Sequence, residues 1–105
     1  MQSNMLMFEA IALRKVVTAV YNRGRVMLAP HILYTKNDAL HIDAITIERD
    51  GVPPREAKLG TFKLDGLAEL ALTDRPFEIS PLFEAGDEKY SGVTLFAVEA
   101  ESVSS

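Results

Sequence analysis

Residues 15–36 read KVVTAVYNRGRVMLAPHILYTK, a segment that predicts two β-strands joined by a turn. Its first seven residues are mostly β-branched or aromatic, a composition typical of a β-strand. Asn22-Arg23-Gly24 is a turn signal, because asparagine and glycine tolerate positive φ angles. The apolar residues after this turn alternate with other residues as far as Tyr34, so they predict a second strand.

Pro30 lies within this second predicted strand. Proline cannot donate a hydrogen bond to a neighbouring strand, so Pro30 marks an edge, a bulge or a sharp bend. The next predicted strand, 40–49, alternates as far as Ala44 and then resumes at Ile45. This slip of one residue predicts a bulge or a bend at that point, of the kind that small barrels need in order to curve.

Turn signals at 36–38 (KND) and 50–54 (DGVPP) delimit that strand. Two shorter apolar stretches, at 61–64 and 70–72, predict two more strands. The five strands follow one another at spacings of roughly 10–15 residues with no long helical pattern between them, which disfavours a parallel sheet. The sequence therefore predicts a small, mostly-β domain built as a barrel or a sandwich.

One short helix is predicted ahead of the strands, at about 4–13. Asn4 is its expected N-cap, and Phe8 and Ile11 follow Met5 at helical spacing. A helix of this length is marginal by itself, so we expect it to pack across one open end of the sheet.

Residues 75–105 are predicted as a C-terminal extension of the same single domain. Two extended segments, 75–77 and 81–83, are expected to pin aromatic side chains onto its body. Residues 92–98 have the composition of a last strand, whereas residues 101–105 are expected to fray.

The composition is that of a folded globular domain, with 48% hydrophobic and 25% charged residues. Cysteine is absent, which excludes disulfides, thiolate metal sites and cysteine nucleophiles and agrees with a reducing compartment. No apolar run approaches the roughly 20 residues needed to cross a bilayer, and the start of the chain lacks the basic region of a signal peptide. We therefore expect a cytoplasmic domain with no membrane partner.

The net charge of −4 disfavours undirected binding to a polyanion, but the charge is unevenly distributed. Residues 1–36 carry five basic side chains against one acidic side chain, whereas residues 37–105 carry six basic and fourteen acidic ones. A local positive face can therefore exist on an acidic protein. Acidic side chains that simply solvate the loops and the tail explain the same distribution.

Arg23 and Arg25 lie on either side of a turn glycine, and Lys63 lies in a later predicted strand. With Tyr21 or Tyr34 they can form a basic-aromatic face of the kind that holds single-stranded nucleic acid. An ordinary solvated turn explains the same arginines, and Tyr21 can equally be a core residue with its hydroxyl at the rim.

From Tyr21 onward, the order of these segments resembles the WYL domain, a small SH3-like or Sm-like β-barrel common in bacterial transcription regulators. Tyr21 ends a strand, residues 26–30 (VMLAP) close on a proline, and Leu40-His41-Ile42 stand at the motif that names the family. Residues 62–67 (FKLDGL) match its late segment. The resemblance implies a five-stranded SH3/Sm-like barrel, here with a short N-terminal helix and a C-terminal extension.

The resemblance also implies a non-enzymatic regulatory domain that binds a nucleotide, a small signalling molecule or single-stranded nucleic acid. The ligand-binding residues expected in this chain are Tyr21, Arg23, Arg25, His41, Lys63 and Asp65. Gly60 and Gly66 stand where the family carries basic side chains, which weakens phosphate recognition. Only about 14 residues precede the first strand, so we expect no helix-turn-helix in this chain.

His31, His41 and Asp43 raise the hypothesis of a metal site, since His41 and Asp43 share one face of a predicted strand. No further strong ligand follows at a recognisable spacing, so a polar outer face explains these residues more simply. The sequence also lacks a nucleophile-elbow motif and a glycine-rich phosphate loop. We therefore expect neither an enzyme nor a bound metal or cofactor.

Two functions from different classes remain open. The first is ligand or nucleic-acid sensing, which predicts that Tyr21, Arg25, His41 and Lys63 line one groove. The second is a protein-interaction or oligomerisation module without a small ligand, because small barrels often leave a strand edge that another chain can extend. It predicts a mass above the 11.6 kDa of one chain in solution.

Overall fold

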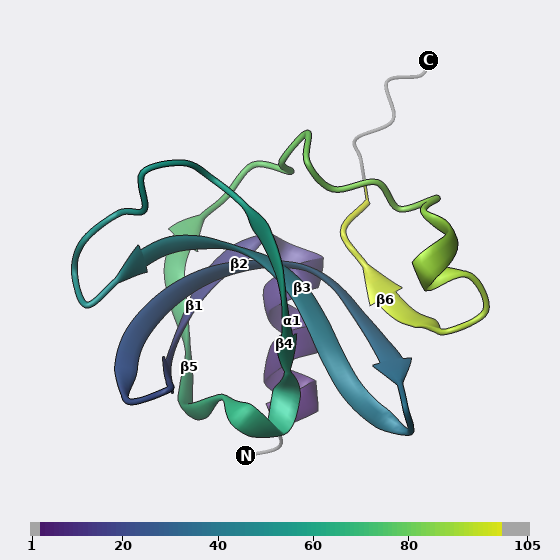
Figure 1. Cartoon of the computed structure of the whole chain (residues 1–105), viewed down its shortest axis with the longest axis horizontal. Coiled ribbons are helices and arrows are strands. Elements are labelled where there is room, and N and C mark those ends of the chain that lie inside the picture. Colours follow the sequence, from purple (N-terminus) through teal and green to yellow (C-terminus); the bar gives the residue numbers. More distant parts are fainter. Residues whose placement is uncertain (1–2, 100–105) are drawn as a thin grey trace.

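One antiparallel sheet organises the chain in a computed structural model that describes residues 3–99 (Figure 1). In chain order the elements are α1 (Ser3–Leu13), β1 (Lys15–Tyr21), β2 (Gly24–Lys36), β3 (Ala39–Arg49), β4 (Leu59–Lys63), the 3₁₀ turn η1 (Leu64–Gly66), β5 (Ala68–Pro76), the 3₁₀ turn η2 (Glu88–Tyr90) and β6 (Thr94–Ala97). The strand order is β4-β3-β2-β1-β5, and β6 pairs with β2. The mostly-β class is confirmed, but the sheet has six strands instead of five and is not closed.

Two tight hairpins join the first three strands. Asn22 and Arg23 have φ angles of 50° and 66°, and Tyr21 pairs directly with Gly24 around them. Positive φ at both central residues is the geometry that matches the twist of antiparallel strands. The turn predicted here is confirmed, although the positive φ angles belong to Asn22 and Arg23 and not to the glycine.

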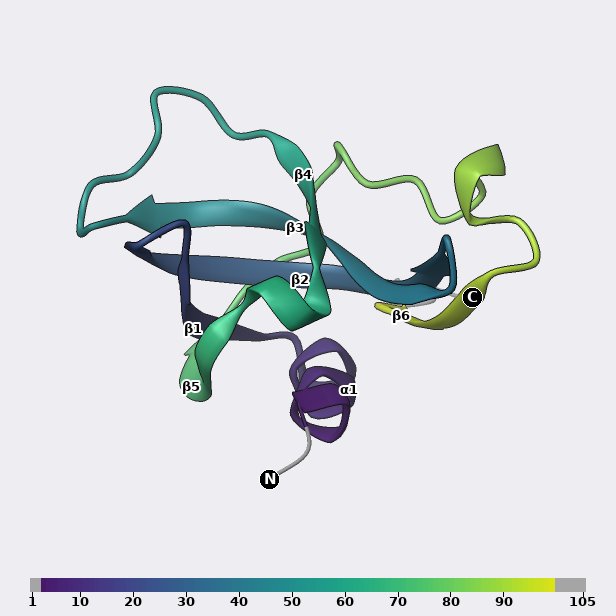
Figure 2. The ribbon, with the colours of Figure 1, turned by 60° about the horizontal axis from the view of Figure 1, so that its bottom comes forward.

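α1 packs against β1, β2 and β5 and covers one side of the sheet, which we call the core face (Figure 2). The helix begins one residue before its predicted N-cap, Asn4, and the predicted stripe is partly wrong, because Met5 is 63% exposed. Apolar residues lie on nearly every side of this helix, so spacing alone could not select the buried side. The buried helix residues are Leu6, Met7, Ala10 and Ile11. The sheet residues of the same core include Val17, Ala19, Val26, Leu28, Leu33, Ile42 and Ala44.

β2 contains the predicted irregularity at Pro30. Pro30 pairs with Ala44 and Ile32 pairs with Asp43, so His31 is an extra residue that forms a bulge. The bulge predicted at Ile45 lies two residues later, because β3 pairs regularly through Ile45 but Met27 pairs with Glu48 and Leu28 with Thr46, which leaves Ile47 as the extra residue. Ile45 instead points to the opposite, outer face of the sheet, where it is buried as well.

The C-terminal segment explains why apolar residues occur on both faces of β3. Parts of residues 77–93 pack on the outer face, where they contact the outer-face residues of β2 and β3. β6 then extends the sheet by pairing with the second half of β2 (Figure 1). The last strand predicted within 92–98 is confirmed as Thr94–Ala97. The fraying predicted for residues 101–105 lies outside the described residues. No helix within residues 3–99 is long and apolar enough to cross a membrane.

Candidate functional site

A polar cluster on the outer face is centred on Asp43 of β3, whose side chain is only 1% exposed. Its Oδ1 accepts hydrogen bonds from the hydroxyls of Tyr34 and Thr61, both at 2.7 Å. Its Oδ2 accepts from the Nζ of Lys89, at 2.9 Å, and from the hydroxyl of Tyr90. Donors from β2, β4 and η2 therefore converge on one carboxylate.

The protonation states of this cluster follow from its contacts. Burial alone would raise the pKa of Asp43, but the hydrogen bonds from Tyr90, Tyr34, Thr61 and Lys89 outweigh burial and lower that pKa below its ordinary value. Burial, together with the negative charge of Asp43, raises the pKa of Tyr34 to about 12 and also raises that of Tyr90. At neutral pH Asp43 is thus a carboxylate, and the phenols of Tyr34 and Tyr90 are neutral.

The cluster fastens the C-terminal segment to the sheet. Each oxygen of Asp43 accepts two hydrogen bonds, and a carboxylate offers about four acceptor sites, so these donors take up its capacity. Among the described residues, no buried side-chain nitrogen or oxygen lacks a hydrogen-bond partner. Strand alternation places Asp43 on the outer face, but no sequence pattern identifies its partners Lys89 and Tyr90, which lie 46 and 47 residues away. A polar residue in the middle of an apolar strand was the only available signal. Within residues 3–99, no three His, Asp or Glu side chains are grouped to hold a metal ion.

The six predicted ligand-binding residues are divided between the two faces of the sheet. Tyr21 packs edge-on against Phe62, with ring centroids 5.1 Å apart, and both rings contact the core. His41 and Lys63 pair directly across β3 and β4. They point to the outer face, because the neighbouring pair Ile42 and Phe62 faces the core.

The other predicted residues lie elsewhere. Arg23 is exposed in the first hairpin turn, and Asp65 is exposed in η1. Arg25 forms a solvent-exposed ion pair with Glu69 at 3.8 Å. Along β2, Arg25 lies nine residues before the residue that pairs with His41, which is about 30 Å of extended strand. The six residues therefore do not line one groove, and only the pair across β3 and β4 stays together.

A small open pocket lies beside that pair. It has a volume of about 270 Å³ and is lined by Tyr34, Thr35, Lys36, Lys89 and Val93. Tyr34 is also the strand partner of His41. Lys36 and Lys63 form no ion pair with any residue in the described range, so both charges face solvent.

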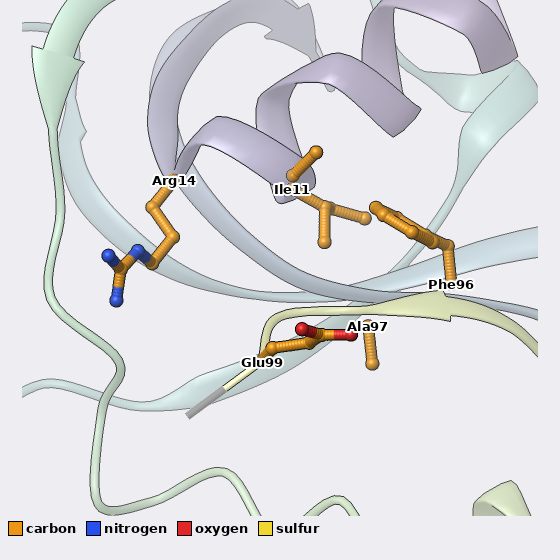
Figure 3. Close-up of a pocket in the computed structure, with 6 residues that line it drawn as sticks. Ile11, Arg14, Phe96, Ala97 and Glu99 are labelled. Atoms are coloured by element: carbon orange, nitrogen blue, oxygen red, sulfur yellow. The ribbon is translucent and has the colours of Figure 1, made fainter. Parts of the chain in front are cut away.

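A second pocket, of about 290 Å³, lies between the end of α1 and β6 (Figure 3). Ile11, Phe96 and Ala97 form its apolar walls, while Arg14 and Glu99 stand on different sides of it (Figure 3). One positive and one negative side chain give the pocket no preference for a ligand of either sign.

Three of the described strands pair on one side only, namely β4, β5 and β6, and they differ in regularity. β6 has only 4 residues and shifts register against β2. β5 shifts register twice against β1, carries Glu69 at a φ of 52° and ends in Pro76. Bulges and proline are features that block the addition of a further strand. β4 pairs with β3 through five consecutive residue pairs, and no strand within residues 3–99 occupies its other side. β4 is therefore the regular one of the three edges and the best suited to pairing with another chain.

Comparison with known proteins identifies no relative of this chain. No family model matches it, and neither the curated proteins nor the solved structures give a match. The resemblance to the WYL domain therefore stays a prediction, and the candidate sites rest on their geometry.

Proposed function

We propose that this domain is a protein-interaction module that joins a second copy of itself through β4 into one continuous sheet. The observation that carries this proposal is the open, regular edge of β4. An edge strand presents unpaired backbone N–H and C=O groups, which another strand can satisfy. Among the described strands, all pairings are antiparallel, and an antiparallel pair of identical strands has the two-fold symmetry that most homodimers use.

The side chains of β4 suit antiparallel pairing with an identical strand, centred on Thr61. In that register Phe62 of one copy lies opposite Gly60 of the other, so that an aromatic ring covers a glycine. Phe62 and Leu59 are only half-buried in the single chain, so a second copy removes further apolar surface from water. Lys63 lies opposite Leu59 of the partner, and no like charges meet directly.

We further propose that β1 to β5 form a divergent, open SH3-like or Sm-like barrel that works as a stand-alone unit. Its support is the path β4-β3-β2-β1-β5, in which five sequential strands follow one helix and η1 links the two outer strands. An open barrel of this kind keeps the β4 edge available.

Sedimentation equilibrium of the full chain over a concentration series tests the self-association. We expect the mass to rise from 11.6 kDa towards that of two chains. Gly60→Lys places a charge where the partner's ring packs, and we expect it to weaken the dimer by about tenfold or more. Gly60 does not have a positive φ, and a Cβ there lies 3.5 Å from the Phe62 ring, so the single chain tolerates the change.

Ala71→Lys is the matched control, because Ala71 is an exposed position on the other outer strand. We expect this variant to associate like the wild type. A wild-type protein that stays monomeric at every concentration contradicts the proposal. So does a dimer that Ala71→Lys disrupts and Gly60→Lys leaves intact.

A second candidate function keeps the ligand-sensing hypothesis on a smaller site. On the outer face of this acidic protein, four basic side chains gather around the pocket and its neighbouring strand pair: Lys36, His41, Lys63 and Lys89. Tyr34 supplies an aromatic wall. A titration with single-stranded RNA and DNA at several salt concentrations tests this site, and we expect binding that tightens at low salt and weakens in Lys63→Gln. Absence of binding at low salt would exclude it.

A further inference from the structure

His31, the extra residue in the β2 bulge, is fully buried and uses both ring nitrogens. Its Nδ1 lies 2.8 Å from the carbonyl oxygen of Ala29, and its Nε2 lies 3.0 Å from the backbone nitrogen of Ser80. A carbonyl oxygen only accepts a hydrogen bond and a backbone N–H only donates one. Nδ1 therefore carries the proton and Nε2 accepts, which fixes one tautomer of the neutral ring.

The same residue holds the segment 77–83, which we call the strap. The imidazole ring packs against Phe77 and Phe83, with centroid distances of 5.0 and 5.4 Å. The hydrogen bond from Ser80 falls between these two aromatic contacts. Three contacts of one side chain thus fix the strap over a shallow pocket of about 220 Å³ on the outer face.

Few charged groups face the ring. Arg75 near the end of β5 and Glu78 in the strap line the same pocket. The other residues of β1, β2 and β3 that line it are apolar: Val16, Ala29, Ile45 and Ile47. On β1, the Nζ of Lys15 donates a hydrogen bond to the carbonyl oxygen of Asp74. On β3, the Asp43 carboxylate already accepts four hydrogen bonds. Among the described residues, no carboxylate lies within ion-pair distance of His31, so none is placed to pair with a positive ring while the strap is closed.

We propose that His31 is an acid-sensitive clasp, whose protonation at Nε2 releases the strap from the outer face. The proton comes from solvent and needs no other reactant. A protonated Nε2 directs an N–H at the N–H of Ser80, so that one hydrogen bond is replaced by a repulsion between two donors. Burial lowers the pKa of His31 below its ordinary value, which is the direction expected for a ring held neutral by its surroundings.

The direction of the pH effect follows from proton linkage. In the released form the ring is exposed and titrates near its ordinary pKa of 6.5, whereas in the closed form its pKa is lower. The closed form is therefore fully favoured above pH 6.5. Below that pH the equilibrium moves towards release by up to about tenfold per pH unit, until the lowered pKa is reached.

The release is local, because the second attachment titrates in a different range. Asp43 holds Lys89 and Tyr90 of η2, and its lowered pKa keeps that attachment charged in mild acid. Between these two ranges the strap opens while η2 stays in place. The apolar residues that lose their cover are Val16, Ala29 and Ile45.

Amide hydrogen exchange of the full chain, from pH 8 to pH 5 and corrected for the intrinsic pH dependence of exchange, tests the clasp. We expect the protection of the Ser80 amide to fall by up to about tenfold per pH unit below pH 6.5. The amide of Tyr90, which donates to the Asp87 carbonyl in η2, should keep its protection over this range.

Two variants assign the effect. Glutamine does not titrate in this range, so His31→Gln should abolish the pH dependence of protection at the Ser80 amide. His41→Gln removes the other histidine of the chain and should behave like the wild type. If His31→Gln does not fold, the single ring of His41→Gln can be titrated by NMR, and its midpoint must coincide with the loss of protection at Ser80. Protection that is independent of pH, or the same pH dependence in folded His31→Gln, overturns the proposal.

Discussion

Asp43 is the residue on which the attachment of the C-terminal segment depends most. One carboxylate receives four hydrogen bonds from three separate parts of the chain, two of them from η2. If Asp43 alone is replaced, its four donors stay buried without the carboxylate that accepted their hydrogen bonds. The loss in free energy of unfolding should therefore be much larger than for the replacement of an exposed acidic residue.

We expect Asp43→Asn to lower the free energy of unfolding by roughly 2–4 kcal/mol, since the amide cannot accept all four hydrogen bonds and leaves Lys89 without its charge partner. Urea unfolding followed by circular dichroism measures this loss. Asp65→Asn, at an exposed position in η1, is the matched control and should stay within about 0.5 kcal/mol of the wild type. Equal losses in the two variants would contradict the role assigned to Asp43.

The position of Asp43 on the outer face could be predicted from strand alternation, whereas its partners could not. Lys89 and Tyr90 lie in a short turn whose place on the sheet is set by the path of the whole C-terminal segment. For the same reason, only part of the predicted ligand-binding set lies together in the structure. Neighbours across two strands, His41 and Lys63, came together, but the tertiary arrangement placed Tyr21 and Arg25 elsewhere.

Among the elements, the features that depend on local sequence signals could be predicted. The two hairpin turns and the bulge at Pro30 depend on residues with restricted or permissive backbones, and these act locally. The buried side of α1 and the facing of Ile45 depend on what covers each surface. Ile45 interrupted the expected alternation because the strap makes the outer face of β3 a second buried surface.

The orientation of α1 gives a test at this scale. Met7 is fully buried against the sheet, whereas Met5, two residues earlier on the same helix, is mostly exposed. Met7→Ala should lower the free energy of unfolding by about 2–4 kcal/mol, because it leaves a cavity in the core. Met5→Ala should change it by less than about 0.5 kcal/mol. Thermal or urea unfolding of both variants decides the matter, and a reversed order would mean that the helix presents its other side to the sheet.

For the whole molecule, the cover on the two faces of the sheet and the regularity of its edges act together. α1 covers the core face, and the C-terminal segment covers part of the outer face. Of the three strands that pair on one side only among the described residues, β5 is irregular through its register shifts and Pro76, and β6 is short and shifts register against β2. β4 is the regular one, so we expect association to occur through that edge.

Association through β4 can be measured by disulfide trapping, because the chain has no cysteine of its own. In the proposed register residue 61 lies opposite itself across the two-fold axis, so Thr61→Cys brings two sulfur atoms within bonding reach. Under mild oxidation we expect Thr61→Cys to form a disulfide-linked dimer far faster than Ala71→Cys on β5, with both variants first shown to be folded. Equal rates, or faster trapping through Ala71→Cys, would contradict association through β4.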